Sequence, residues 1–321
     1  MTAEIKTTRD VFIEQIYKRM YEDEKIFFLC ADFGSPKLDI LREKFPDRFI
    51  NVGIAEQNLI NIATGLALEG YTVFAYAIAP FLTMRAYEQI RINLSLQAQL
   101  KDINVNLIGV GAGLSYDVSG PTHHCLEDLS LMRTLPHLIV FSPSDWALAQ
   151  KFVDYSINVK KPKYLRFDGK PLPQIYEDAS AISFENGFTE LFHGERICLV
   201  TTGYMTHKAI NVVTKCAAEK NLSIGLIDVY LLKPFNEELF YDTIKHYAHV
   251  ITIEEGFVNK GGLDGLVSAI LDSRNSGIHI KRMGFGDAYV FEIGNREYLH
   301  KLNNLDEESI NTTIKDLMRE N

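Results

Sequence analysis

The sequence predicts an α/β protein of two domains, with a doubly wound, mostly parallel sheet in the first domain and a smaller α/β unit after it. Three observations lead to this prediction. Apolar runs of strand length alternate with segments of helical periodicity along the chain. These runs are apolar throughout, as in strands that helices cover on both faces. The alternation fades between residues 169 and 194 and then begins again, which predicts domains at 1–168 and 195–321 joined by a linker.

The first domain begins with an expected helix over 8–22. Its expected strands are 25–32, 49–54, 71–78, 105–112, 138–143 and 163–168, and its later helices are 55–69, 81–98 and 145–159. In such sheets ligands bind beyond the carboxyl ends of the strands. Residues that directly follow these strands are therefore the first candidates for a functional site.

The linker at 169–194 contains turn residues and isolated aromatics, and we expect a short antiparallel hairpin in it. The second domain resumes the alternation. Its expected strands are 196–203, 223–229, 249–256 and 279–285, and its expected helices are 206–219, 236–247, 262–273, 296–303 and 306–319.

Composition narrows the class of protein. The chain has 321 residues, 46 % of them hydrophobic and 23 % charged, which is typical of globular proteins. Its net charge of −9 and the absence of a dense basic run argue against a nucleic acid or an anionic membrane as partner. No apolar run reaches membrane-spanning length, and the first twenty residues lack the apolar core of a signal peptide. Four scattered cysteines are expected to be reduced thiols, so a cytoplasmic location is predicted.

Glu56 stands where an apolar strand gives way to an apolar helix. One explanation is electrostatic, because a negative charge is favourable in the first turn of a helix. The other is that a carboxylate at a strand-to-helix junction faces a ligand. Phe81 follows the next strand at the same edge, and a carboxylate near an aromatic ring could hold a flat heterocycle with a basic nitrogen. The residues alone leave both explanations open.

A turn-rich loop, "GVGAGLSYDVSGPTHHCLEDL" at 109–129, follows the strand at 105–112. Loops of this kind on a rigid sheet often carry function. Its histidines, His123 and His124, are either functional or exposed beside a helix capped by Thr122. The histidines, carboxylates and cysteines show no zinc-site spacing. Motifs for dinucleotides, P-loop phosphates, hydrolase nucleophiles and kinases are also absent from the sequence.

Four segments together resemble transketolases: "DRFINVGIAEQNLINIATGLALEG", "FLTMRAYEQIR", "AGLSYDVSGPTHHCLEDLSLMRTLPHLIVFSPSD" and "CLVTTGYMTHKAI". The resemblance covers roughly 8–310 and matches the pyrimidine-binding and C-terminal domains of that family. It is closest to the C-terminal subunit of split transketolases, whose two halves are separate chains. The resemblance implies an enzyme that transfers a two-carbon ketol unit with thiamine diphosphate.

The resemblance also implies roles for single residues. Glu56 matches the glutamate that shares a proton with N1′ of the cofactor pyrimidine, which leads to a carbanion at the thiazolium. Phe81 matches the aromatic that stacks on that ring. His123 matches a histidine that contacts substrate oxygens and assists proton transfer. The other matches are Ile78 and Met84 in the cofactor pocket, Asp32 near the cofactor, and Arg166 on the sugar phosphate, with a surface cation as its alternative.

The sequence departs from the family at three places. Ser119 replaces an acidic residue that contacts the acceptor's α-hydroxyl, and Gly111 replaces a phosphate-contacting histidine, so an unusual substrate is expected. The G-D-G…N motif that binds Mg²⁺ and the diphosphate is missing, and "GFGDAY" at 284–289 does not replace it. We therefore expect a partner, an N-terminal diphosphate-binding subunit that holds Mg²⁺, in a heterotetramer with two copies of each chain. The isolated chain could also form a homodimer.

Two other functions stay open from the sequence. The beta subunit of a 2-oxoacid dehydrogenase, or a carboligase that uses pyruvate, shares this cofactor and domain order. A regulatory paralogue without catalytic activity is the alternative from another class. Such a paralogue would have no chemical need for Glu56 and His123, which argues against it.

Overall fold

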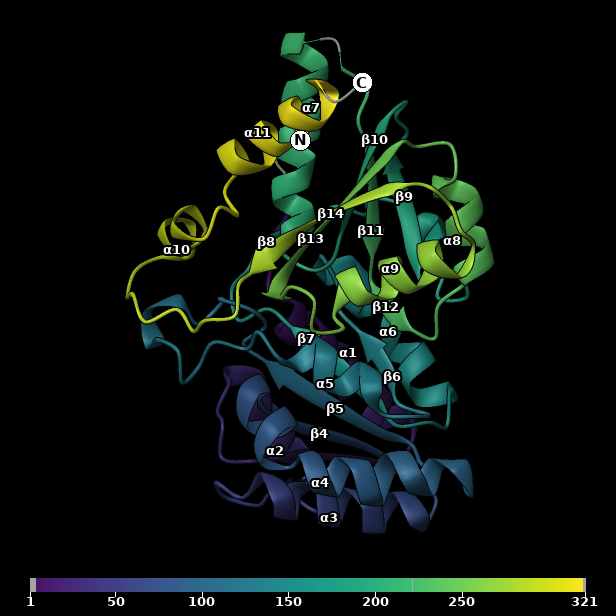
Figure 1. Cartoon of the computed structure of the whole chain (residues 1–321). Coiled ribbons are helices and arrows are strands. Elements are labelled where there is room, and N and C mark those ends of the chain that lie inside the picture. The colour runs from purple at the N-terminus through teal and green to yellow at the C-terminus, as the bar shows by residue number, and fades with distance from the viewer. Residues whose placement is uncertain (1–3, 221, 320–321) are drawn as a thin grey trace.

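The structure is a computed structural model that describes residues 4–220 and 222–319. It confirms an α/β chain with two domains, which Figure 1 shows one above the other. In the described part of the chain, a seven-stranded sheet and a five-stranded sheet form the centres of the two domains. A two-stranded ribbon of β1 (Ile5–Lys6) and β8 (Leu172–Pro173) closes the first domain.

The first sheet has the strand order β12-β6-β7-β5-β4-β2-β3. Its parallel strands are β2 (Ile26–Cys30), β3 (Phe49–Asn51), β4 (Thr72–Ile78), β5 (Val105–Val110), β6 (Ile139–Phe141) and β7 (Lys163–Phe167). The strand β12 (Leu231–Lys233) pairs antiparallel with β6. Because the other strands are parallel, their carboxyl ends share one edge, and we call it the carboxyl edge.

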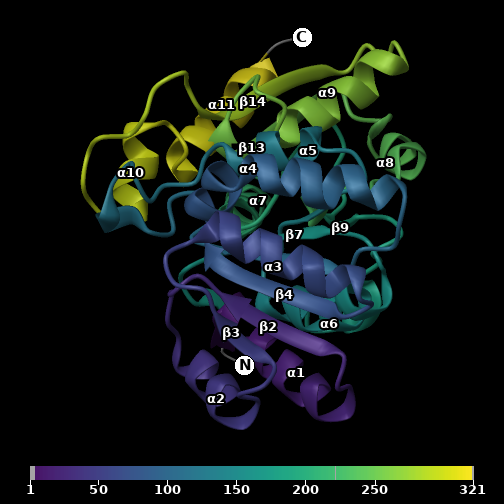
Figure 2. The same cartoon turned by 90° about the horizontal axis from the view of Figure 1, so that it is seen from below.

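Helices cover both faces of this sheet, as strands with buried residues on both faces require. One face packs against α1 (Thr8–Glu22), α2 (Pro36–Lys44) and α6 (Trp146–Asn158). The other packs against α3 (Glu56–Leu68), α5 (Asp128–Thr134) and a helical run at 81–99. That run was predicted as one helix, and it consists of the turns η1 (Phe81–Arg85), α4 (Tyr87–Gln89), η2 (Ile90–Leu96) and η3 (Gln97–Gln99). Figure 2 shows α3 and α4 beside each other on this face.

The second sheet has the order β14-β13-β10-β11-β9. Its strands are β9 (Phe188–Phe192), β10 (Ile197–Thr201), β11 (Gly225–Val229), β13 (His249–Phe257) and β14 (His279–Phe285), and only β9 is antiparallel to its neighbour among these described strands. Its helices are α7 (Met205–Lys220), α8 (Glu237–Ile244), α9 (Leu263–Ser273), α10 (Arg296–Leu302) and α11 (Glu307–Arg319). Among the described residues, no helix combines the length and the apolarity needed to cross a bilayer.

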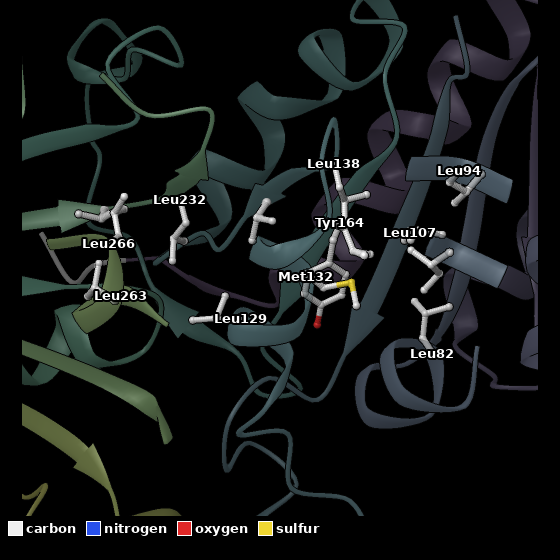
Figure 3. Packing of buried hydrophobic residues seen from close by; sticks show 14 of the residues in the cluster. Leu82, Leu94, Leu107, Leu129, Met132, Leu138, Tyr164, Leu232, Leu263 and Leu266 are labelled. Atoms are coloured by element: carbon white, nitrogen blue, oxygen red, sulfur yellow. The ribbon is translucent and has the colours of Figure 1, made fainter. Parts of the chain in front are cut away.

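The linker differs from the prediction. The expected hairpin is wrong, because β8 pairs with β1 and β9 becomes the edge strand beside β11. Conversely, β12 leaves the second half of the chain to extend the first sheet. The strand β12 thus ties the two domains together. A single hydrophobic cluster also crosses the boundary, from Leu107 and Leu129 to Leu232 and Leu263 (Figure 3).

Candidate active site

Glu56 is the first residue of α3, at the carboxyl edge. The turn that places it there depends on Gly53, whose φ of +76° favours glycine. The Gly53 amide donates to Oδ1 of Asn51 at 2.9 Å, and the Ala55 amide donates to the Gly53 carbonyl at 2.8 Å. The chain therefore reverses tightly, and the side chain of Glu56 is only 3 % exposed. Its place in the first helical turn also favours its negative charge, so the electrostatic explanation holds as well.

Glu56 does not lie among apolar residues alone, which corrects the expectation from the sequence. Nη1 of Arg85 donates to Oε2 of Glu56 at 2.7 Å. The same guanidinium lies over the Phe81 ring, 4.9 Å from its centroid. The side chain of Arg85 is 48 % exposed. Sequence reasoning missed Arg85 because a lone arginine in a helical segment looks like part of a solvent-facing surface, and 29 positions separate it from Glu56.

Phe81 also brings the histidine loop to this place. The rings of Phe81 and His123 meet edge-on, with centroids 5.3 Å apart and planes at 69°. Nδ1 of His123 is 3.0 Å from the Thr122 hydroxyl. Thr122 is not the cap of a helix, since α5 begins only at Asp128 with Glu127 as its N-cap. Glu56, Arg85, Phe81 and His123 thus form one continuous set, which we call the edge cluster.

Four further predicted residues lie at or near the carboxyl edge. Asp32 follows β2, is exposed, and accepts from the side-chain amide of Asn51 at 3.0 Å. Ile78 ends β4 and is half-buried, whereas Met84 in η1 is 40 % exposed. Ser119 is exposed in the loop after β5. No hydrogen bond or ring contact among the described residues joins these four to the edge cluster.

Arg166 is not a surface cation, and the structure shows it already paired inside the protein. It is 3 % exposed, and its Nε donates to Oδ2 of the fully buried Asp128 at 2.7 Å. Its Nη2 donates to the Glu255 carbonyl at 2.9 Å and to the Cys125 carbonyl at 3.3 Å. Burial opposes the charged guanidinium most strongly, but Asp128 together with Tyr164 and Cys125 raises the pKa of Arg166 above its ordinary value. The structure thus gives Arg166 a place in the interior between the domains.

Gly111 has a local explanation. Its φ is +103°, and a Cβ at this position would lie 2.4 Å from the ring of Tyr116. A histidine would be strained there and would displace that ring. The side chain that the family usually has at this position is therefore incompatible with the conformation of this loop.

No group of three or more metal-ligating side chains occurs in the described ranges. Asp287 of the "GFGDAY" segment has an 89 % exposed side chain and pairs with Lys260 at 3.2 Å. These residues therefore offer no cage for Mg²⁺, which prefers carboxylates together with phosphate oxygens.

Comparison with known proteins agrees with this geometry. The family model for the pyrimidine-binding domain of transketolase matches residues 5–173, and that for the transketolase C-terminal domain matches 190–310. One of the subunits of the apulose-4-phosphate transketolase of Actinobacillus succinogenes is 34 % identical over 303 residues, 94 % of this chain and 95 % of that protein. The 1-deoxy-D-xylulose-5-phosphate synthase of Clostridium perfringens strain 13 is 30 % identical over 96 % of this chain, but over only 48 % of that protein.

A solved structure is also similar over nearly the whole chain. It is a split gene transketolase in an inactive beta4 tetramer, with a TM-score of 0.84, 31 % identity and 97 % of each chain covered. The order of the two domains agrees with these matches. The chain belongs to the transketolase family, as a subunit that carries the pyrimidine-binding and C-terminal domains of a split enzyme.

Proposed function

We propose that the edge cluster is the pyrimidine side of a thiamine diphosphate site, completed by a separate diphosphate-binding subunit. With that subunit, the chain transfers a two-carbon ketol unit from a ketose or ketose phosphate to an aldose. The observation that supports this most is that Glu56, Phe81 and His123, which are far apart in the sequence, meet at the carboxyl edge.

The residues fit the pyrimidine ring of the cofactor. Oε2 of Glu56 accepts from Arg85, whereas Oε1 makes no hydrogen bond with any described residue. Oε1 can therefore share a proton with a ring nitrogen. Arg85 lies over the ring of Phe81, on which the pyrimidine would stack. The Arg85 side chain is 48 % exposed and can turn toward solvent, whereas Glu56 is 3 % exposed, so the ring nitrogen would have to replace Arg85 as the partner of the buried carboxyl.

The roles of the residues follow from these positions. Thiamine diphosphate supplies, when bound, the carbon nucleophile that carries the two-carbon unit. Glu56 would hold a proton against N1′ of the pyrimidine, and the burial of its carboxylate excludes competing water. Phe81 would fix the plane of the ring. His123 uses Nδ1 for Thr122 and keeps Nε2 without a partner among the described residues, so Nε2 can bond a substrate hydroxyl. Ile78, Met84 and Asp32 would border the cofactor.

The partner subunit is proposed to hold Mg²⁺ and the diphosphate, in an assembly with two copies of each chain. The similar split gene transketolase forms an inactive tetramer of beta subunits, which supports the view that such a chain is inactive alone. The substrate is proposed to be a sugar or sugar phosphate outside the common pentose phosphates, because Ser119 and Gly111 depart from the family. The similarity to a transketolase named for apulose-4-phosphate fits this proposal. All four cysteines are buried thiols, which suits the cytoplasm.

Calorimetry tests the split site directly. The isolated chain is titrated with thiamine diphosphate and Mg²⁺, and the titration is repeated after mixing with a diphosphate-binding subunit. We expect weak or no binding alone, tight binding in the mixture, and ketol transfer only in the mixture. Tight binding and turnover by the isolated chain would refute the proposal. Turnover of pyruvate instead of a ketose in the mixture would favour a carboligase.

A further inference from the structure

The loop 111–125, which carries Ser119 and His123, lies against the C-terminal domain. Figures 1 and 2 both show it, in blue to teal, crossing to the yellow α10. This contact is unexpected, because α10 is part of the second domain and lies more than 170 positions further along the chain. The chemistry of the contact is built around Asp117.

Asp117 is 3 % exposed and has three donors around its carboxylate. Oδ2 accepts from the backbone amide of Arg296 at 2.7 Å and from the ammonium of Lys170. Oδ1 accepts from the amide of Val118 at 2.9 Å. Burial alone would raise the pKa of Asp117, but Lys170 and the backbone donors lower it below the ordinary value. The loop is thus attached to the first residue of α10 by a charged hydrogen bond, a strong type.

Arg296 is itself fixed by buried charges. It is 4 % exposed, its Nη1 donates to Asp168 at 2.7 Å, and its Nε donates to Glu255 at 2.7 Å. A second ion pair joins its Nη2 to Glu255, and His300 bonds the same carboxylate at 2.6 Å. The guanidinium also lies 3.6 Å from the centroid of the Tyr204 ring. Asp168 follows β7 of the first sheet, whereas Glu255 and Arg296 belong to the second domain, so this arginine bridges both domains.

The loop also packs closely against residues of the second domain at its base and at Gly120. Gly113, with φ of +54°, approaches Glu255 so closely that a Cβ would lie 2.0 Å from Oε2. Gly113 pairs with Cys125 in a two-stranded bridge, which closes the loop at its base. A Cβ on Gly120 would lie 3.0 Å from Cδ1 of Ile293, just before α10. The loop therefore follows the surface of the second domain from its base to the residues next to His123.

We infer that Arg296 is a positioning residue for the reaction, and that the C-terminal domain sets the place of His123 through Asp117. Asp117 lies six positions before His123. Nε2 of His124 is 3.3 Å from the carbonyl oxygen of Asp117. The edge-on contact of His123 with Phe81 then depends on a loop held by α10. The effect on substrate rests on the proposed function, whereas the effect on the loop does not.

Hydrogen–deuterium exchange on the isolated chain tests the effect on the loop. The variants are Arg296→Met, which removes the bridge, and Asp117→Asn, which keeps the size but removes the charge on the loop side. Arg296→Lys keeps the positive charge but lacks the planar guanidinium that bonds Asp168 and Glu255 at the same time. Glu297→Gln, the next residue of α10 and paired instead with Lys208, is the matched control.

We expect the amides of 118–124 to exchange at least about tenfold faster in Asp117→Asn, the scale of one weakened hydrogen bond to a charged group. Arg296→Met keeps the backbone amide that donates to Asp117, but it frees the start of α10 from Asp168 and Glu255, so exchange in the loop should rise there as well. Arg296→Lys should be intermediate, and amides of β2 should not change in any variant. Unchanged exchange in the loop, or an equal increase in β2, would overturn the inference and leave Arg296 a purely structural residue. If Arg296→Met does not fold, Asp117→Asn decides alone.

In the complex with the diphosphate-binding subunit, the same variants should raise the KM for the aldose more than they lower kcat. Affinity for thiamine diphosphate should stay as in the unmodified protein, because these substitutions do not change Glu56 or its position at the carboxyl edge. A loss of cofactor affinity instead would contradict the positioning role. Absence of ketol transfer in the unmodified complex would refute the proposed function alone, since the exchange result stands without it.

Discussion

Replacing Arg166 by methionine separates a structural role from a substrate role. Methionine keeps much of the side-chain volume but removes the charge. Among the described residues, the fully buried Asp128 would then keep only the hydroxyl of Tyr164 as a donor, at 2.7 Å. The carbonyls of Cys125 and Glu255 would lose a donor as well.

The expected loss of stability follows from this burial. Breaking a buried ion pair by removing one partner costs about 3–5 kcal/mol, because the other charge stays buried. In a chain of this size that lowers the melting temperature by on the order of 10 °C. The double variant Arg166→Met with Asp128→Asn should recover part of the loss, because it removes both charges.

Scanning calorimetry of the isolated chain is the assay. The matched control is Arg19→Met, since Arg19 pairs with Asp154 while their side chains are 40 % and 64 % exposed. This control should lose no more than about 1 kcal/mol. A melting temperature of Arg166→Met equal to that of the unmodified chain, together with lost sugar turnover in the complex, would refute the reasoning. Arg166 would then act on the substrate.

Three further outcomes are expected. Glu56→Gln should fold normally and lose at least about 10²-fold in turnover with the partner present, the scale of a positioned acid–base group; near-normal turnover would exclude the proton-sharing role. His123→Ala should impair sugar turnover while cofactor affinity, measured by calorimetry, stays close to normal; the reverse result would place His123 at the cofactor. Burial raises the pKa of Glu254 from 4.5 to about 7, so the folded chain binds more protons than the unfolded chain between these values, and stability should fall as pH rises through this window. Glu254→Gln should flatten that part of the pH dependence in denaturant titrations, and an unchanged slope would contradict it.

Much of the fold could be predicted because local patterns decide it. The apolar run that became β4 needs burial on both faces, and a parallel sheet supplies it. One missed element had a local signal: α2 begins with Ser35 as N-cap and Pro36 as its first residue, a typical helix start. The strand β12 had no local sequence signal, because its three residues pair with β6 only through the packing of the two domains.

The residues of the candidate site also fall into two groups, those that local sequence signals predict and those that they do not. Glu56, Phe81 and His123 could be predicted, because they follow strands or lie in motifs of a family. Arg85 and Arg166 could not be placed, since their partners are 29 and 38 positions away and a cation in a short segment does not show which carboxylate it meets. The sequence therefore indicates which groups are candidates for the site better than it indicates which charges are already paired.

Those paired charges give a physical reason for a divided site. A diphosphate needs several positive groups or a metal ion to bind it. Of the cations placed near the carboxyl edge, Arg166 is paired with Asp128, Arg296 with Asp168 and Glu255, and Lys170 with Asp117. Arg85 pairs with Glu56, the carboxylate proposed to face the pyrimidine. None of these four can neutralise a diphosphate without leaving a buried carboxylate unpaired, which supports the proposal that the positive charge comes from a second polypeptide and its metal ion.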